Sequence, residues 1–379
     1  MSGFAAEPMA QGRRENGPFL ATLVLLAGTG LATLWSSSSG FALSLGKPAS
    51  YFLTKQLLFY IPAVAVFAFL AFLPLESLRA KVGPLTLIGL ASLLLPFLPG
   101  LGENRNGASR WVDLGFTTLQ PSEFWKPISI VYLAHILDRR REAEGLGPFV
   151  LPFVLAGAGC LLIFLQNNLS TAVIAGLVAV ALFWVAGAPA AFFLGLTAVA
   201  LPLAALSVLT SEFRLRRILT FLVPAYAPHG QSYQVLGSLR AIRSGGFFGK
   251  GVGLGTLKLG SVPEVQSDFI FAAWSEEMGL VGVLVFFAVW VFFCYSAYRR
   301  AFEEEDGFRS YLGFGLTTLL GLEVLVNVSV ASGLLPATGI ALPFFSAGGS
   351  SLMATGAVAG LLVNLSRPRV AGGEGGLHV

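Results

Sequence analysis

The sequence is poor in charged residues and in the side chains that commonly bind metals. Only 12% of its 379 residues are charged, about half the share found in an average soluble domain. It has two cysteines, Cys160 and Cys294, which lie far apart within apolar stretches, and its three histidines form no HExxH or other zinc pattern. These absences exclude a disulfide-rich secreted domain and a zinc site of a known spacing.

Long apolar segments dominate what remains, since 55% of the residues are hydrophobic. Many of these segments reach the roughly 20 residues that are needed to cross a bilayer. The 45 glycines and 20 prolines also suit helices packed in lipid. We therefore expect an all-α integral membrane protein of about ten transmembrane helices, over residues 19–37, 51–73, 82–99, 121–138, 149–166, 168–186, 190–210, 269–298, 309–332 and 344–366.

Lysine and arginine in the short loops predict the orientation. With a cytoplasmic N-terminus, twelve basic residues lie inside and five lie in the outer joints. Residues 1–18 and 367–379 are then cytoplasmic tails, and 19–366 form the membrane domain. The segment 211–268, between the seventh and eighth helices, becomes one large extracytoplasmic loop.

This outer loop carries a net charge of +4. The orientation of the protein in the membrane does not require this excess of positive charge. The excess therefore indicates either an anionic ligand such as a phosphate group or a solvated loop that contacts anionic lipid. Its basic and acidic residues are Arg214, Arg216, Arg217, Arg240, Arg243, Lys250 and Lys258 against Glu212, Glu264 and Asp268.

Polar residues also gather before the fourth predicted helix, from Asn106 to Lys126. Pro121 and Glu123 are typical of a helix N-terminus. Capping does not explain Lys126, because a cation is unfavourable in the first turn. Arg110, Glu123 and Lys126 therefore indicate either a buried charge cluster or an anion site.

Asp268 stands where the basic loop meets the eighth predicted helix. It is either an N-cap or a catalytic carboxylate. Glu276 follows eight residues later, or roughly 12 Å along a helix, which exceeds the about 5–9.5 Å between the carboxylates of glycosidases. A lone carboxylate suffices for glycosyl transfer from a diphosphate-linked donor, because cations stabilise the leaving diphosphate and only the acceptor hydroxyl needs a base.

The third polar region runs from the ninth predicted helix to the tenth. Glu323 and Asn327 lie four residues apart on one helix face, and an intramembrane carboxylate is a functional candidate. Gly348 to Ser351 fit either a close-packed seam or a functional site. The Gly356–Gly360 pair is a GxxxG pattern, which predicts close helix packing.

Together these regions resemble the SEDS family. The resemblance rests on three stretches in that order and spacing. They are 106–126 (NGASRWVDLGFTTLQPSEFWK), 245–279 (which contains VPEVQSDFIFAAWSEEMG) and 334–351 (LLPATGIALPFFSAGGSS). It implies a ten-helix enzyme of the bacterial cytoplasmic membrane that joins lipid II molecules into glycan strands and releases undecaprenyl pyrophosphate. The family's acidic residue of the large outer loop corresponds to Asp268, which we expect to be the catalytic base of an inverting glycosyltransferase.

The resemblance also implies the substrate contacts and the partners. The residues expected to bind substrate are Arg110, Trp111, Glu123, Lys126, Arg243, Lys250, Glu264, Ser350 and Ser351. The implied partners are a class B penicillin-binding protein and membrane lipid, with no nucleic acid. A divalent cation, Mg²⁺ or Mn²⁺, is left open as a cofactor. The sequence looks more like the division member FtsW than the elongation member RodA.

The chain departs from the family's usual pattern at three places: Asn167-Asn168 stands for Pro-Asp, Glu323 for Gln and Ala347 for Tyr. Two other functions stay open. A lipid II flippase would use the polar residues within the bundle, and a non-catalytic scaffold of the division complex would use the charged outer loop for docking.

Overall fold

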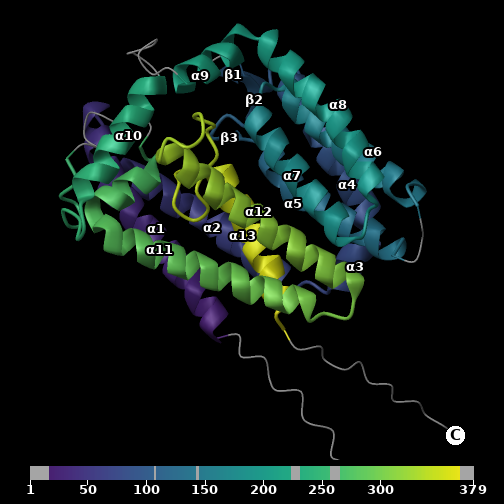
Figure 1. Cartoon of the computed structure of the whole chain (residues 1–379). Coiled ribbons are helices and arrows are strands. Elements are labelled where there is room, and N and C mark those ends of the chain that lie inside the picture. Colours follow the sequence, from purple (N-terminus) through teal and green to yellow (C-terminus); the bar gives the residue numbers. More distant parts are fainter. Residues whose placement is uncertain (1–16, 106–107, 142–144, 223–230, 257–264, 368–379) are drawn as a thin grey trace, which may run out of the picture.

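The computed structural model describes residues 17–105, 108–141, 145–222, 231–256 and 265–367 (Figure 1). Glu264 and Lys258 of the outer loop lie outside these ranges. The described elements are α1 (Gly17–Ser44), α2 (Tyr51–Phe72), α3 (Leu75–Ala80), α4 (Val82–Ser92), a 3₁₀ turn (Leu95–Phe97), β1 (Gly102–Arg105), β2 (Ala108–Asp113), β3 (Thr118–Leu119), α5 (Pro121–Arg139), α6 (Gly147–Leu165), α7 (Leu169–Val185), α8 (Ala190–Leu209), α9 (Glu212–Leu222), α10 (Gln231–Gly245), α11 (Ile270–Phe302), α12 (Gly307–Ala331) and α13 (Gly349–Leu365).

Each of the ten apolar segments contains a helix. Within the described ranges, six helices are long and apolar enough to cross a membrane by length and composition, namely α1, α2, α6, α8, α11 and α12. Shorter apolar helices cover residues 82–97, 169–185 and 349–365. The fourth predicted segment is α5, which carries charged residues and is largely buried. The expectation of a predominantly helical, multi-pass fold is confirmed.

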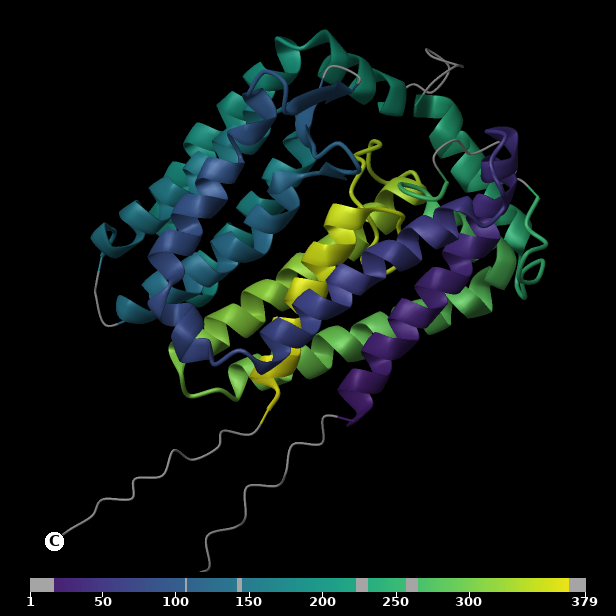
Figure 2. The ribbon, with the colours of Figure 1, turned by 180° about the vertical axis from the view of Figure 1, so that it is seen from behind.

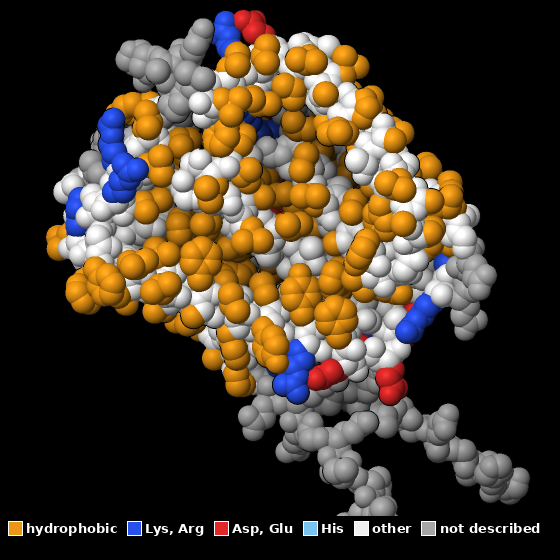
Figure 3. Space-filling model, viewed as in Figure 1, with side chains coloured by type: hydrophobic (Ala, Val, Ile, Leu, Met, Phe, Trp, Pro, Cys, Tyr) orange, Lys and Arg blue, Asp and Glu red, His pale blue; other side chains and the backbone are white. Residues whose placement is uncertain are grey.

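The helices form a bundle with two distinct ends (Figures 1 and 2). One end carries the small sheet, α9 and α10, and is called the sheet end below. The other holds the start of α1 and the end of α13, and is called the terminus end. Hydrophobic side chains cover most of the face in Figure 3, and the charged groups visible there gather toward the two ends. This distribution fits a protein whose middle faces lipid.

Helix α12 forms the centre of the bundle, where it packs against α5, α7, α11 and α13. The GxxxG prediction is confirmed at the contact between α13 and α2. A Cβ on Gly356 would lie 2.8 Å from the carbonyl oxygen of Ala63, and one on Gly360 would lie 2.5 Å from that of Phe67. The absence of side chains at these two positions lets the backbones approach closely.

The predicted outer loop is more ordered than its composition suggests, because it contains α9 and α10. A three-stranded antiparallel sheet, in the order β1-β2-β3, also lies at this end, between α4 and α5. The sequence did not predict these elements. The sheet matters for the site because β2 carries Arg110 and Trp111.

Helix α11 is broken at Gly279, whose backbone angles (φ 63°, ψ −166°) are not helical. The loop of residues 245–251 fills the break. The N–H groups of Leu280 and Val281 donate to the carbonyls of Gly246 and Phe247 (3.0 and 3.1 Å). In return, the N–H groups of residues 250 and 251 donate to the carbonyls of residues 276 and 277 (both 3.0 Å). The glycine-rich segment is thus an insert that satisfies the broken helix.

Candidate functional site

Asp268 lies at the sheet end, in the turn of residues 265–268 that precedes α11. The helix begins at Ile270 with Phe269 in the N-cap position, so Asp268 is not the helix cap. Its side chain is half-buried. Its Oδ2 atom would lie 3.6 Å from a Cβ placed on Gly339, so the carboxylate faces the loop that joins α12 to α13 (residues 332–348, the α12–α13 loop).

Two arginines from different elements lie close enough to Asp268 to interact with it electrostatically. Burial lowers the pKa of Arg110 on β2, while the charges of Asp268 and Glu123 act in the opposite direction. Burial also lowers the pKa of Arg217 on α9, and the charge of Arg110 lowers it further, whereas Asp268 raises it. The two guanidinium groups therefore repel each other beside one carboxylate. An anion bound between them would relieve that repulsion.

Arg110 retains unused hydrogen-bonding capacity. Its Nε atom is buried and has no hydrogen-bond partner within the described part of the chain. A guanidinium group offers five N–H donors in a planar fork that matches phosphate oxygens. Arg110 is therefore suited to bind a phosphate group next to Asp268.

Lys126 lies in the first turns of α5, near Arg110, and is only 3% exposed. Its Nζ atom donates to Glu123 Oε2 at 2.9 Å and to Glu323 Oε1 on α12. Since both contacts are ion pairs, Lys126 is the centre of a buried cluster with two carboxylates. Of the two arrangements that the sequence left open, the structure contains the buried charge cluster. Glu123 also interacts with Arg110, so the cluster is continuous with the arginines.

The other predicted contact residues are distributed around this centre. Lys250 donates to Glu276 Oε1 (2.7 Å), which also accepts from the N–H of Thr256 (3.0 Å). Ser350 is buried, and its Oγ accepts from the N–H of Gln120 at 3.0 Å. Lys250 and Ser350 therefore have partners within the protein.

Three further predicted residues lie on the elements around this region. Arg243 is exposed near the end of α10. Trp111 on β2 is half-buried and is paired in register with Glu103, and Ser351 is half-buried in the first turn of α13. Glu264 lies outside the described residues.

The described residues provide no cage for a metal ion, because no three His, Cys, Asp or Glu side chains come together there. Arg110 and Arg217 both interact electrostatically with Asp268, and Arg110 also interacts with Glu123. An ion such as Mg²⁺ is usually held by one or two carboxylates together with substrate phosphates, so a divalent cation stays a proposal here.

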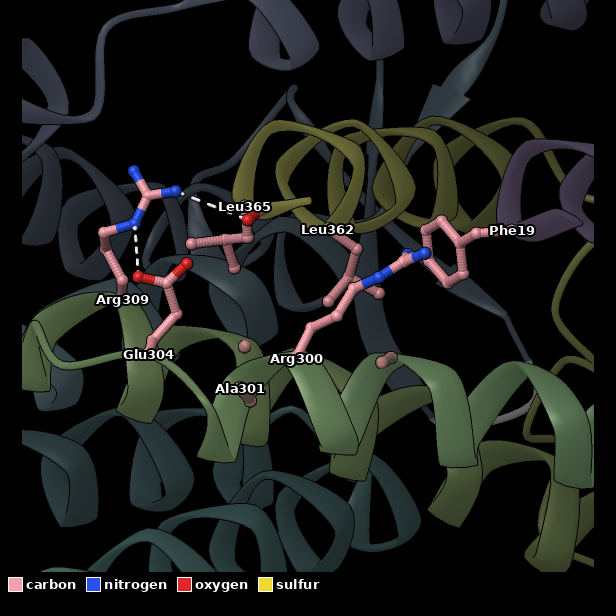
Figure 4. Close-up of a pocket in the computed structure, with 9 residues that line it drawn as sticks. Phe19, Arg300, Ala301, Glu304, Arg309, Leu362 and Leu365 are labelled. Atoms are coloured by element: carbon pink, nitrogen blue, oxygen red, sulfur yellow. Dashed lines mark hydrogen bonds and ion pairs between the residues drawn. The ribbon is translucent and has the colours of Figure 1, made fainter. Parts of the chain in front are cut away.

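A small pocket lies at the terminus end, far from Asp268 along α11 and α12 (Figure 4). In it, Arg309 donates to Glu304 Oε2 (3.2 Å) and to the carbonyl of Leu365 (3.3 Å). The guanidinium of Arg300 lies 4.6 Å from the centre of the Phe19 ring. These contacts join α1, α11, α12 and α13, so we interpret the pocket as part of the packing at this end.

Comparison with known proteins agrees with this geometry. Residues 18–370 match the family model described as cell cycle protein, which covers FtsW, RodA and SpoVE. The chain belongs to this family. The resemblance seen in the three polar segments is therefore confirmed.

Relatives in the FtsW, RodA and SpoVE family match along nearly the whole chain. A protein of Geobacter metallireducens named "Probable peptidoglycan glycosyltransferase FtsW" is 35% identical over 352 residues, covering 92% of this chain and 93% of that protein. One of the same name from Borreliella burgdorferi is 34% identical, covering 92% and 96%.

Solved structures of the family share the fold. One chain belongs to a structure described as "Structural coordination of polymerization and crosslinking by a peptidoglycan synthase complex", with a TM-score of 0.73, 26% identity and coverage of 92% of this chain and 96% of that one. The rod shape determining protein RodA of Thermus thermophilus gives a TM-score of 0.68 at 26% identity, covering 95% and 98%.

The sequence did not single out Arg217 among the basic residues of its loop. A helical reading of EFRLRRILTFL would have placed Arg214 and Arg217, three residues apart, on one face. Arg214 donates to Asn167 Oδ1 (3.3 Å), which joins α9 to the turn before α7. This contact and the interaction of Arg217 with Asp268 both place that face toward the bundle.

Proposed function

We propose that this protein is a peptidoglycan glycosyltransferase that polymerises lipid II at the outer face of the cytoplasmic membrane. The observation that carries the proposal is the placement of Asp268 beside Arg110 and Arg217 at one end of the bundle. The names of the relatives, which match over 92% of the chain, support the same activity. Because these relatives are FtsW proteins, the proposed process is cell division.

The proposed reaction is an inverting transfer with Asp268 as the general base. The carboxylate takes the proton of the acceptor hydroxyl, and the hydroxyl oxygen forms a bond to the anomeric carbon of the donor sugar. The bond between that carbon and the diphosphate oxygen breaks, and its electrons stay on the diphosphate, which leaves as undecaprenyl pyrophosphate. Arg110 and Arg217 stabilise the charge that develops there. The buried Lys126 cluster holds Glu123 next to Arg110.

The orientation belongs to the same proposal. The excess of lysine and arginine in the loops of the terminus end supports a cytoplasmic location for both termini. Asp268 at the sheet end is then extracytoplasmic. We also propose a class B penicillin-binding protein as a partner. The similarity to a chain of a peptidoglycan synthase complex supports this choice.

A flippase is less consistent with the polar residues inside the bundle. Lys126 is bound to two carboxylates, and Asn327 donates to two backbone carbonyls. These side chains are used within the protein, whereas the Nε atom of Arg110 at the sheet end has no hydrogen-bond partner within the described residues. The polar groups thus support chemistry at one membrane face better than a path across the membrane.

The deciding measurement is polymerisation of purified lipid II by the protein in detergent, with and without the partner transpeptidase. We expect Asp268→Ala and Asp268→Asn to lower the rate at least about 100-fold, since general bases contribute that much or more. Asp113→Asn is the matched control, because Asp113 is exposed at the same end and accepts from the N–H of Gly115. Wild-type rates in both Asp268 variants would rule out the assignment, and lipid II translocation by vesicles without polymer would favour the flippase.

A further inference from the structure

The turn that carries Asp268 is held through three successive carbonyl groups, those of residues 266–268. All three accept hydrogen bonds from α12 or from the α12–α13 loop. In order along the turn, the bonds join Gln266 to the N–H of Ala347 (2.8 Å), Ser267 to Ser346 Oγ (2.5 Å) and Asp268 to Asn327 Nδ2 (3.2 Å). The backbone of the proposed base is therefore fixed to the C-terminal part of the bundle.

Asn327 is the member of this set that binds the backbone of Asp268 itself. Its side chain is 1% exposed, and its Nδ2 atom also donates to the carbonyl of Ile340 at 2.7 Å. Both partners are acceptors, so the amide nitrogen must face them, because a flipped amide would place its oxygen against two carbonyl oxygens. No aliphatic side chain and no ionised carboxylate of similar size can make these two bonds.

The oxygen atom of the Asn327 amide makes no comparable hydrogen bonds. The Oδ1 atom of Asn327 is buried and has no hydrogen-bond partner within the described residues. A buried acceptor without a partner destabilises the folded state. A leucine, which has a similar branched shape, would avoid that penalty near the end of α12 but would leave the carbonyls of Asp268 and Ile340 without this donor. The asparagine is therefore explained by the two bonds that it donates, one of them to the backbone of Asp268. Features that lower stability in this way concentrate at functional sites.

We propose that Asn327 is a positioning residue for Asp268, an inference that rests on the proposed function. It fixes the backbone of Asp268 and the α12–α13 loop relative to each other. The distance and direction from the carboxylate to the acceptor hydroxyl thereby stay constant. Among the described residues, the hydrogen bonds of Asn327 go to the backbone of Asp268 and Ile340 and to neither arginine. We therefore expect its loss to act on turnover and to leave substrate affinity unchanged.

The chain offers a matched control for this proposal. Asn364 on α13 also donates from its Nδ2 atom to two backbone carbonyls, those of Leu70 and Leu73 (2.7 and 2.6 Å). It lies near the terminus end, in the last turn of α13, and is 9% exposed. Asn327→Ala and Asn364→Ala therefore remove the same kind of interaction, once beside Asp268 and once far from it.

The experiment measures kcat and KM for purified lipid II in wild type, Asn327→Ala, Asn364→Ala and Asp268→Ala. For Asn327→Ala we expect kcat to fall about 10- to 100-fold, the effect of a misplacement of about 1 Å, with KM within about twofold of wild type. Asn364→Ala should keep the kcat of wild type. Thermal unfolding in detergent should show comparable losses of stability for the two asparagine variants.

Several outcomes would overturn the positioning role. They are a wild-type kcat in Asn327→Ala, equal losses of kcat in both asparagine variants, or a rise in KM with kcat unchanged. If Asn327→Ala does not fold, Ser346→Ala removes the neighbouring bond to Ser267 and carries the same expectation. A wild-type kcat in Asp268→Ala would instead refute the proposed function. Failure of the positioning role and failure of the proposed function therefore give different results.

Discussion

Replacing Lys126 with methionine is expected to destabilise the protein strongly. Lys126 is 3% exposed and forms ion pairs with Glu123 on α5 and Glu323 on α12, and Glu323 is itself 6% exposed. Methionine fills similar space, but it leaves the buried carboxylate of Glu323 and the partly buried one of Glu123 without Lys126. Breaking a buried ion pair from one side costs about 3–5 kcal/mol, and here two pairs are broken together. We expect the free energy of unfolding to fall by at least about 3 kcal/mol.

Glu323→Gln is the informative companion, because the glutamine amide oxygen still accepts from Lys126. In the wild type the cluster holds one cation and two carboxylates. Glu323→Gln removes one negative charge and makes the cluster neutral. We expect the free energy of unfolding to change by less than about 1 kcal/mol, since a hydrogen bond to a charged group remains. In Lys126→Met/Glu323→Gln the only carboxylate of the cluster that lacks Lys126 is Glu123, which still interacts with Arg110. The double variant should therefore be more stable than Lys126→Met by about 1–3 kcal/mol.

The assay is reversible unfolding by SDS in mixed micelles, followed by tryptophan fluorescence and circular dichroism. Arg299→Met is the control, because Arg299 pairs with Glu303 on an exposed surface and its loss should not be measurable. The reasoning fails if Lys126→Met is as stable as wild type, or if Glu323→Gln is as unstable as Lys126→Met. In either case the cluster would not act as a buried ion network.

Two further predictions concern the arginines and the glycines of the sheet end. Arg217→Gln should lower kcat/KM for lipid II at least about tenfold, the order expected when one charge-assisted contact is lost. Arg216, which pairs at the surface, is its control, and equal losses in both variants would argue against a specific role. Gly249→Ala should abolish the monodisperse peak in detergent size-exclusion chromatography, because its Cβ would lie 2.1 Å from the carbonyl oxygen of Glu277 at φ +81°. Gly253→Ala has a similar φ of +80° without that contact and should cost only about 1–2 kcal/mol, so equal behaviour of the two would refute the steric argument.

The helices of the bundle were predictable because each apolar run must satisfy its backbone within the membrane. The break in α11 was not, since Gly279 lies in a continuous apolar segment and glycine is common in transmembrane helices. The break is favourable only because the loop of residues 245–251, which is distant in sequence, bonds to the free backbone groups at the break. Helices α9 and α10 were missed for a related reason, because short amphipathic segments lack the long apolar run that marks a span.

In the candidate site, too, the sequence predicts some features and not others. Asp268, Arg110 and Lys126 were found because charged residues are rare near apolar segments and each needs an explanation. Their partners were not assigned, because pairing depends on contacts across long sequence separations. Lys126 and Glu323 are 197 residues apart, and no local pattern predicts that contact. Lys250, which the sequence predicts at the substrate, also forms an ion pair with Glu276 beside the α11 break, and no local pattern predicts that contact either.

The charge balance near Asp268 differs from that of the buried pairs elsewhere. Arg309 and Glu304 neutralise each other, as do Lys250 and Glu276, whereas two arginines interact with the one carboxylate of Asp268. During the proposed transfer, Asp268 loses its negative charge as it takes a proton, and the diphosphate gains one as its bond to the sugar breaks. The negative charge thus moves from one neighbour of the arginines to another. In this proposal Arg110 and Arg217 interact with both positions and stabilise the charge throughout the transfer without reorganising, which is the condition for lowering a barrier rather than only tightening binding.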